Sequence, residues 1–442
     1  MNWVDIYKSK ITTAEDAATY IKSGDRVYIG AGCGVPHSLV DAMVGCAADL
    51  WNVEITHLLT IGPAPYAKPE MAEHFRHNAV FVGGNVREAI NSGRGDYIPI
   101  YLADVPKLYL QGHLPLDVAL VSLSPPDEHG FCSFGIEVGC TKPAAHAAKK
   151  VIAEVNTEMP RTLGDSFIHV SKVDQFVEVS RPLDVLGKPE ISDVHRRIGR
   201  YIADLIEDGS TLQMGIGAIP DAVLLFLDEK EDLGVHTEMF SDGLIELIER
   251  GIVTNDKKTV HPGKAIVGFL LGSRRLYEFV DNNALIEFHP TDYVNNPLLI
   301  SQNDKMVAIN SAIQVDITGQ VSADSIGYYI YSGFGGQVDF MRGAARSSGG
   351  KPITALPSTA KGGAVSRIVP HLDEGAGVVT NRADVHYVVT EYGVAYLYGK
   401  NLRQRVRALI DLAHPNFRED LLRFAHEHNY LPRATAVGRD VG

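Results

Sequence analysis

The chain has 442 residues, a formal net charge of −13 and 45% hydrophobic residues. The acidic balance argues against nucleic acid or an anionic membrane as the main partner. No apolar run approaches the roughly 18 residues of a membrane span, and "MNWVDIYKSK" (1–10) lacks the apolar core of a signal peptide. We therefore expect a soluble, cytoplasmic protein with more than one domain.

Along the chain, runs rich in Val and Ile alternate with helical patterns. This alternation predicts an α/β fold with mostly parallel sheets flanked by helices. The stretch "SRPLDVLGKPEISD" (180–193) has two prolines and no helical period, so we interpret it as a linker. The predicted strands are "RVYIG", "NVEITHLL", "VALVSL", "STLQMG", "GVHTEMF" and "KMVAIN".

Four cysteines occur in the first half, and none belongs to a C-x-x-C pair. A zinc ribbon or a dithiol redox motif is therefore not expected, and no other ligand spacing suggests a metal. So few cysteines in a chain of this length fit a reducing compartment. The four residues are Cys33, Cys46, Cys132 and Cys140.

The two sides of the linker repeat each other weakly, with a spacing of about 185 residues. The repeat predicts a duplicated α/β unit. With Gly62 aligned on Gly243, Glu238 stands opposite His57, so the carboxylate belongs to the second copy only. The other aligned glycines are Gly24, Gly30, Gly32 and Gly130 in the first copy, and Gly209, Gly215, Gly217 and Gly319 in the second.

A glycine turn follows the predicted strand that ends at Met214. "GIGAI" (215–219) precedes Pro220, which suits the first turn of a helix. Strand, turn and helix start together leave N–H groups free to bind a phosphate or a developing oxyanion. The alternative is a plain tight turn.

Glu238 lies at the carboxyl end of the next predicted strand, "GVHTEMF" (234–240), where open α/β sheets bind ligands. It could instead cap a helix or form a local ion pair. Zinc deaminase chemistry is excluded, because P-C-x-x-C is absent. Glu391 and the cluster Asp127, Glu128 and His129 are rival polar sites, and the residues alone do not rank the three.

A second glycine cluster, "SGFGGQVDF" (332–340), predicts a close approach of backbone to ligand at Gly333, Gly335 and Gly336. Basic residues follow it. Arg342, Arg346, Lys361 and Arg367 are the candidates for holding phosphates, with Arg342 and Lys361 put first, although each could equally belong to a solvated surface.

These motifs resemble those of a known family. "GIGAIPDAV", "HTEMFSDG", "SPPDEHGFCSFG", "DSIG", "SGFGGQVDF" and "VTEYGVA" look like motifs of the acetyl-CoA hydrolase/transferase family, the class I CoA-transferases. The branch of 4-hydroxybutyrate and butyryl-CoA:acetate CoA-transferases is the most similar. The resemblance runs from about residue 3 to about residue 430.

The resemblance implies two similar domains of the NagB/RpiA/CoA-transferase type, with the active site between them. We place them at residues 1–185 and 190–432, followed by a flexible tail at 433–442. It also implies a homodimer or a dimer of dimers. CoA would be a substrate, with no permanently bound cofactor.

By resemblance, Glu238 is the nucleophile. The motifs also imply a set of oxyanion and CoA-binding residues, in which Asn310 joins the two glycine clusters. That set is Gly215, Ile216, Gly217, Ala218, Ile219, Asn310, Gly333, Gly335 and Gly336.

The expected reaction moves CoA from a short-chain acyl-CoA to a free carboxylate, with 4-hydroxybutyrate or butyrate and acetyl-CoA or acetate as the first candidates. Ping-pong covalent catalysis through a glutamyl-CoA thioester suits that exchange. An acyl-CoA hydrolase that uses the same Glu238 is one alternative. A non-catalytic protein that binds CoA or a sugar phosphate is the other.

Overall fold

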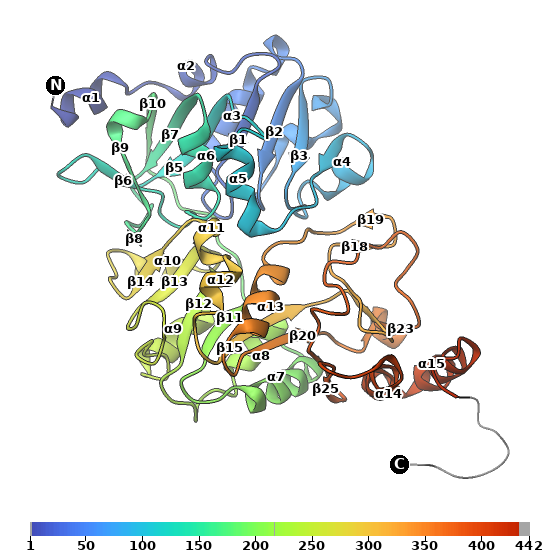
Figure 1. Ribbon diagram of the computed structural model, residues 1–442. Helices are drawn as coiled ribbons and strands as arrows, with labels where there is room; N and C mark the ends of the chain where they lie inside the picture. The colour runs from blue at the N-terminus through green and yellow to red at the C-terminus, as the bar shows by residue number, and fades with distance from the viewer. Residues whose placement is uncertain (1, 216, 433–442) are drawn as a thin grey trace, which may run out of the picture.

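The computed structural model describes residues 2–215 and 217–432. The predicted site residue Ile216 and the predicted tail 433–442 lie outside them. Two large β-sheets, each with helices packed around it, form two bodies stacked on one another (Figure 1). Among the described helices, none combines the length and the apolar composition that crossing a membrane requires.

The first sheet has seven parallel strands in the order β10-β7-β5-β1-β2-β3-β4. The interior strand β5 is buried along its whole length, as expected for a strand covered on both faces. The strands are β1 (Arg26–Ile29), β2 (Val53–His57), β3 (Phe75–Ala79), β4 (Gly95–Tyr97), β5 (Val118–Leu123), β7 (Lys150–Asn156) and β10 (Gln175–Val179). The helices of this half are α1 (Trp3–Ser9), α2 (Ala14–Ala18), α3 (His37–Gly45), α4 (Arg87–Asn91), α5 (Val105–Leu110) and α6 (Thr141–Ala147).

The second sheet has nine strands in the order β25-β24-β20-β15-β11-β12-β13-β14-β8, parallel except for β25. Its edge strand β8 comes from the first half of the chain and pairs with β14. The strands are β8 (Leu163–Gly164), β11 (Thr211–Met214), β12 (Gly234–Phe240), β13 (Ala265–Leu270), β14 (Ile286–Phe288), β15 (Met306–Ser311), β20 (Lys351–Ala355), β24 (Tyr387–Thr390) and β25 (Gly393–Tyr396).

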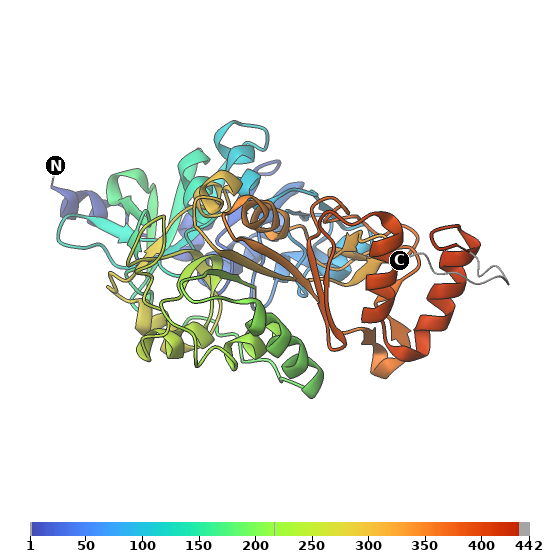
Figure 2. The same cartoon turned by 60° about the horizontal axis from the view of Figure 1, so that its bottom comes forward.

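The helices of the second half begin after the predicted linker. α7 starts with a capping box, in which the Ser192 hydroxyl accepts from the His195 N–H. α11, α12 and α13 lie toward the first half, whereas α14 and α15 lie at the far end (Figures 1 and 2). The helices are α7 (Asp193–Leu205), α8 (Ala218–Leu224), α9 (Asp242–Glu249), α10 (Arg274–Val280), α11 (Thr291–Val294), α12 (Pro297–Ile300), α13 (Gln337–Arg346), α14 (Leu402–Leu412) and α15 (Pro415–Glu427).

Small sheets complete the described fold. They are β6 (Phe131–Ser133) with β9 (Phe167–His169), β16 (Gln314–Asp316) with β17 (Val321–Ser322) and β23 (Ile368–Val369), β18 (Ser325–Ile326) with β19 (Tyr329–Ile330), and β21 (Thr359–Ala360) with β22 (Val365–Ser366). Short 3-10 turns connect several elements, and one of them, η4 (Leu102–Asp104), reaches the junction between the two bodies.

The strand orders of the two sheets correspond. β7-β5-β1-β2-β3-β4 of the first sheet repeats as β20-β15-β11-β12-β13-β14 of the second. One detail of the predicted alignment is wrong. Val27 pairs with Ile55 and Leu212 pairs with Val235, so the residue that corresponds to His57 is Thr237. Glu238 then corresponds to Leu58, because the connection to the following glycine differs in length by one residue.

Backbone hydrogen bonds join the two bodies directly. The Leu270 N–H donates to the Ile136 carbonyl at 2.8 Å, and the Leu186 N–H donates to the Gly272 carbonyl at 2.9 Å. One buried hydrophobic cluster contains side chains from both halves. A shared core and shared backbone bonds hold the two sheets at a fixed junction.

Candidate active site

Glu238 lies near the carboxyl end of β12, at the junction of the two bodies. Strands on both sides fix its backbone: the Thr237 hydroxyl donates to the Met214 carbonyl on β11 at 3.1 Å, and Gly268 lies opposite it on β13. A Cβ on Gly268 would lie 3.0 Å from the Glu238 carbonyl oxygen, so this close approach depends on glycine.

Two donors hold the Glu238 carboxylate. The Asn295 Nδ2 donates to Oε2 at 2.6 Å, and the Gly336 backbone N–H also donates to the carboxylate. Both hydrogen bonds favour the ionised form, but burial opposes it more strongly, and the pKa of Glu238 is raised to about 7. Near neutral pH the group therefore exists in both protonation states, and its ionised form is a poorly solvated carboxylate, which is the condition of a reactive nucleophile.

The second glycine cluster packs directly against this carboxylate. A Cβ on Gly336 would lie 1.8 Å from Glu238 Oε2 and 2.1 Å from Asn295 Nδ2. A Cβ on Gly333 would lie 2.9 Å from the ring of Phe81, and Gly335 has a φ of +54°. Gly336 therefore faces the Glu238 carboxylate, whereas Gly333 and Gly335 face Phe81. The approach of a ligand to this cluster stays a prediction.

The first half of the chain holds the glycine cluster in place. The Leu102 N–H donates to the Gly335 carbonyl at 2.9 Å, and the Val82 N–H donates to the Ser332 carbonyl at 3.1 Å. The candidate site thus draws on both bodies: β12 supplies the carboxylate, and loops of the first half support the residues around it.

The first glycine turn lies at the end of β11, the strand beside β12. Gly217 has φ +122° and ψ 178°, a conformation open essentially to glycine alone. Gly215 faces the end of β15, where the Asn310 Nδ2 donates to Gln213 Oε1 at 3.0 Å. Gly215, Gly217, Asn310 and Glu238 therefore share one edge of the sheet.

A cavity of 260 Å³ continues along this edge beyond β11 and β15. Arg367 is half-buried there, and within the described part of the chain no carboxylate forms an ion pair with it. Burial lowers the pKa of Arg367 and the pKa of His195. The cavity is lined by His195, Ala218, Ile219, Ser311, Ala312, Ala355, Pro357, Thr359 and Arg367.

Arg342 and Lys361, the two cations put first for phosphate binding, have different surroundings from Arg367. Arg342 forms an ion pair with Asp384 at 3.1 Å, and its guanidinium lies over the Tyr101 ring. Lys361 is exposed in the hairpin between β21 and β22, next to the cavity but not in its lining. Of the two, Lys361 lies nearer to Arg367 in the chain and shares its hairpin.

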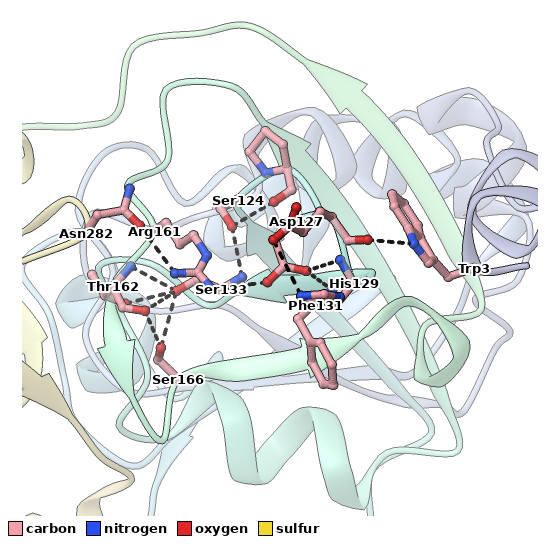
Figure 3. Close-up of polar contacts among 12 residues, drawn as sticks. Trp3, Ser124, Asp127, His129, Phe131, Ser133, Arg161, Thr162, Ser166 and Asn282 are labelled. Carbon is pink, nitrogen blue, oxygen red and sulfur yellow. Dashed lines mark hydrogen bonds and ion pairs between the residues drawn. The ribbon is translucent and has the colours of Figure 1, made fainter. Parts of the chain in front are cut away.

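The rival polar sites have structural partners. The Glu391 carboxylate accepts from the Ser358 N–H and hydroxyl. Asp127 accepts from the His129 and Phe131 N–H groups, both at 2.9 Å, and pairs with Arg161 at 3.1 Å (Figure 3). Asp127 therefore stabilises a turn. The buried Glu391 carboxylate accepts a hydrogen bond at each of its two oxygens.

Sequence reasoning missed several residues of the site. Asn295 lies in "YVNNP", which carries no motif, and Phe81 and Gln213 lie in ordinary strand patterns. Asp339 lies in the quoted motif "SGFGGQVDF" but had no predicted role. A polar residue that is fully buried, as Asn295 is, could be identified only from the fold.

In residues 2–215 and 217–432, no group of three or more His, Cys, Asp and Glu side chains could hold a metal ion. The functional groups at the junction are the Glu238 carboxylate, the Asn295 amide and backbone N–H groups. These groups can attack a carbonyl and stabilise the oxyanion that forms.

Comparison with known proteins agrees with this geometry. The chain is 56% identical over 96% of its length to the 4-hydroxybutyrate coenzyme A transferase of Clostridium kluyveri, covering 98% of that protein. It is 37% identical over 97% of its length to the butyryl-CoA:acetate CoA-transferase of Anaerostipes caccae, covering 98% of it. Both relatives are matched along nearly their whole length.

Solved structures agree as well. RipA from Yersinia pestis has a TM-score of 0.93 at 35% identity, with 98% of this chain and 100% of that chain covered. A 4-hydroxybutyrate CoA-transferase from Porphyromonas gingivalis has a TM-score of 0.84 at 42% identity, with 97% and 100% covered.

The fold and its junction site define a two-domain α/β protein of the CoA-transferase type. The family model of the acetyl-CoA hydrolase/transferase N-terminal domain matches residues 1–183, and that of the C-terminal domain matches residues 272–425. The chain belongs to the acetyl-CoA hydrolase/transferase family. The predicted family and fold class are confirmed, whereas the roles of individual residues stay predictions.

Proposed function

We propose that the protein is an enzyme that transfers CoA from a short-chain acyl-CoA to a free carboxylic acid, with Glu238 as its nucleophile. The observation that carries the proposal is the Glu238 carboxylate, partly buried and held by Asn295 and Gly336 where the two bodies meet. The transferase names of the relatives support 4-hydroxybutyrate or butyrate, with acetate or acetyl-CoA, as the first substrates to test.

The exchange proceeds through covalent steps in which no activation is lost. Glu238 attacks the thioester carbonyl, the C–S bond breaks, and a mixed anhydride and CoA thiolate form. The thiolate then attacks the Glu238 carbonyl, which gives a glutamyl-CoA thioester and releases the first acid. A second carboxylate reverses both steps, so the kinetics are ping-pong.

Each attack places negative charge on a carbonyl oxygen. The Asn310 amide and the backbone N–H groups of the two glycine clusters are the donors that we propose for it. Loss of one such donor lowers the rate about 10²–10³-fold in comparable sites. The glycine at position 217 leaves open space beside its Cα, which a ligand can enter.

We further propose that the CoA arm follows the carboxyl edge of the second sheet, from Glu238 to Arg367. β12 and β20 are separated by β11 and β15, and three inter-strand spacings amount to roughly 14 Å. An extended pantetheine arm spans a distance of this order. Its nucleotide phosphates would then meet the half-buried Arg367 and His195, with Lys361 at the rim.

Trapping the intermediate tests the nucleophile. The protein is incubated with butyryl-CoA, reduced with borohydride, and the modified peptide is mapped by mass spectrometry. We expect a modified Glu238. Modification of Glu391, or a Glu238→Ala protein with unchanged activity, would overturn the assignment.

A second measurement separates transfer from hydrolysis, since relatives named acetyl-CoA hydrolase also match this chain. Butyryl-CoA turnover is followed with and without acetate. We expect turnover to depend on acetate and to yield acetyl-CoA. Fast turnover that ignores acetate would favour a hydrolase, in which water resolves the intermediate.

We propose a cytoplasmic location and a homodimer or dimer of dimers, on the resemblance to the family. The division into domains at 1–185 and 190–432 is likewise a proposal. Light scattering of the purified chain tests the oligomeric state.

A further inference from the structure

The two ends of the buried Asn295 amide differ in their hydrogen bonding. It has no exposed surface and lies directly after α11. Its Nδ2 donates to Glu238 Oε2 at 2.6 Å, yet its Oδ1 has no hydrogen-bond partner in the described part of the structure. Leaving a buried carbonyl oxygen unpaired has a free-energy cost. Asn295 carries this cost in the arrangement in which its Nδ2 donates to Glu238.

A second carboxyl group lies behind this pair. Asp339 is on α13, three residues after Gly336, and only 4% of it is exposed. Its Oδ2 accepts from the Ala103 backbone N–H at 3.0 Å. The structure thus places Asp339 between the first half of the chain and the Glu238–Asn295 pair.

Within residues 2–215 and 217–432, no lysine or arginine forms an ion pair with Asp339. Glu238 and Asp104 raise its pKa, and the Asn295 amide lowers it. Lys107 and Arg342 interact electrostatically with Asp339, but each is paired with a different carboxylate, Asp104 and Asp384 respectively. Burial is the largest influence and raises the pKa of Asp339 to about 8.

We propose that Asp339 is a positioning residue that keeps a proton beside Glu238, while Asn295 holds the Glu238 carboxylate in the orientation for attack. This inference rests on the function proposed above.

The reason is electrostatic. Glu238 and Asp339 both interact with the Asn295 amide, and Glu238 raises the pKa of Asp339. Two carboxyl groups that share a poorly solvated site do not both ionise readily, so one of them retains a proton. Glu238 accepts from Asn295 and Gly336, whereas Asp339 accepts from Ala103. The short bond of the Asn295 amide, 2.6 Å, is to Glu238, and Asp339 has the higher pKa, so Glu238 is the group that ionises first.

The sign of the pH dependence follows. Below about pH 7 Glu238 is protonated and cannot attack. Above about pH 8 Asp339 ionises, and its charge opposes both the oxyanion and the departing thiolate. Activity should therefore be highest between these two values and fall on both sides.

The test compares pH profiles of kcat/KM for butyryl-CoA with acetate, from about pH 5.5 to about pH 9.5. We expect Asp339→Asn, which cannot ionise, to retain activity within about threefold at its best pH and to lose the alkaline fall. We expect Asn295→Ala to lower kcat about 10–100-fold and to move the acidic limb to higher pH, because it removes a bond to ionised Glu238.

Asp420→Asn on exposed α15 is the matched control and should follow the wild type. Asp339→Ser is a second neutral variant if Asp339→Asn does not fold. A wild-type profile with no alkaline fall, or a neutral variant that keeps that fall, would overturn the inference. So would a folded neutral variant as inactive as Glu238→Ala, since that would make Asp339 part of the chemistry.

Two outcomes distinguish failure of the proposed function from failure of the proposed role of Asp339. An active Glu238→Ala protein would refute the proposed function and this inference together. An inactive Glu238→Ala protein with an unaltered Asp339→Asn profile would refute only the role of Asp339.

Discussion

Ser358 binds both oxygens of the Glu391 carboxylate: its backbone N–H donates to Oε2 at 2.8 Å, and its hydroxyl donates to Oε1 at 2.6 Å. Both oxygens are therefore engaged, and Glu391 is only 6% exposed. The bond fixes the loop that follows β20, where Pro357 and Thr359 line the cavity beside Arg367.

We expect Glu391→Gln to retain covalent labelling at Glu238. Gln can accept only with one oxygen, so the loop loses order and the KM for acyl-CoA rises by about tenfold, with kcat changed less. Steady-state kinetics and the borohydride trap measure both effects. A complete loss of labelling in the folded variant would contradict this structural role.

Gly336→Ala should abolish turnover without unfolding the protein. The added methyl group would overlap Glu238 Oε2, so the carboxylate or α13 must shift. We expect a fall in kcat of about 10²–10³-fold or more, measured with circular dichroism as a check on folding. Gly45→Ala is the matched control, because no atom lies near its added methyl group. Equal activity of the two variants would show that the glycine does not serve the site.

Arg367→Ala should separate recognition of the nucleotide from the chemistry. If Arg367 meets the CoA phosphates, kcat/KM for butyryl-CoA should fall about 10–100-fold. The value for butyryl-pantetheine, which lacks the nucleotide, should not change. Arg403→Ala on exposed α14 is the control. An equal loss with both thioesters would place Arg367 outside nucleotide binding.

Glu238→Gln should stabilise the protein increasingly as the pH rises from about 4.5 to about 7, and fully above that. The folded pKa of Glu238, about 7, is above its ordinary value of 4.5, so the folded state binds the proton more tightly. The ionised group then lowers stability fully above about pH 7, and not below about pH 4.5.

We expect the variant to gain on the order of 2 kcal/mol at pH 8, after allowance for partial exposure, and nothing near pH 4.5. Urea unfolding at both pH values measures the difference. Glu427→Gln, at an exposed position of α15, is the control. A gain of equal size at both pH values would show that ionisation is not its cause.

The fold class followed from local patterns, because buried strands and glycine turns have short-range signatures. Those patterns also put Glu238 at the end of a strand and Gly215 and Gly217 beside it. The register error at His57 arose where local signals are weakest, in a connection whose length differs between the copies.

The partners of Glu238 could not be read from the chain. Asn295 is 57 positions away, and Asp339 reaches the site only because α13 packs at the junction. The same limit applies to Arg342, since its ion pair with Asp384 joins residues 42 positions apart. Long-range packing decides which polar residues meet, and a single sequence does not record it.

The edge strand β8 has a consequence for how this protein is made. Leu163 and Gly164 are synthesised early, but their partner β14 leaves the ribosome more than a hundred residues later. The first half must therefore carry an unpaired strand until translation is well advanced. Expressed alone and ended at residue 185, it would expose that strand to neighbouring molecules. Fragments intended to reassemble should be cut before Thr162, so that β8 and β14 stay on one polypeptide.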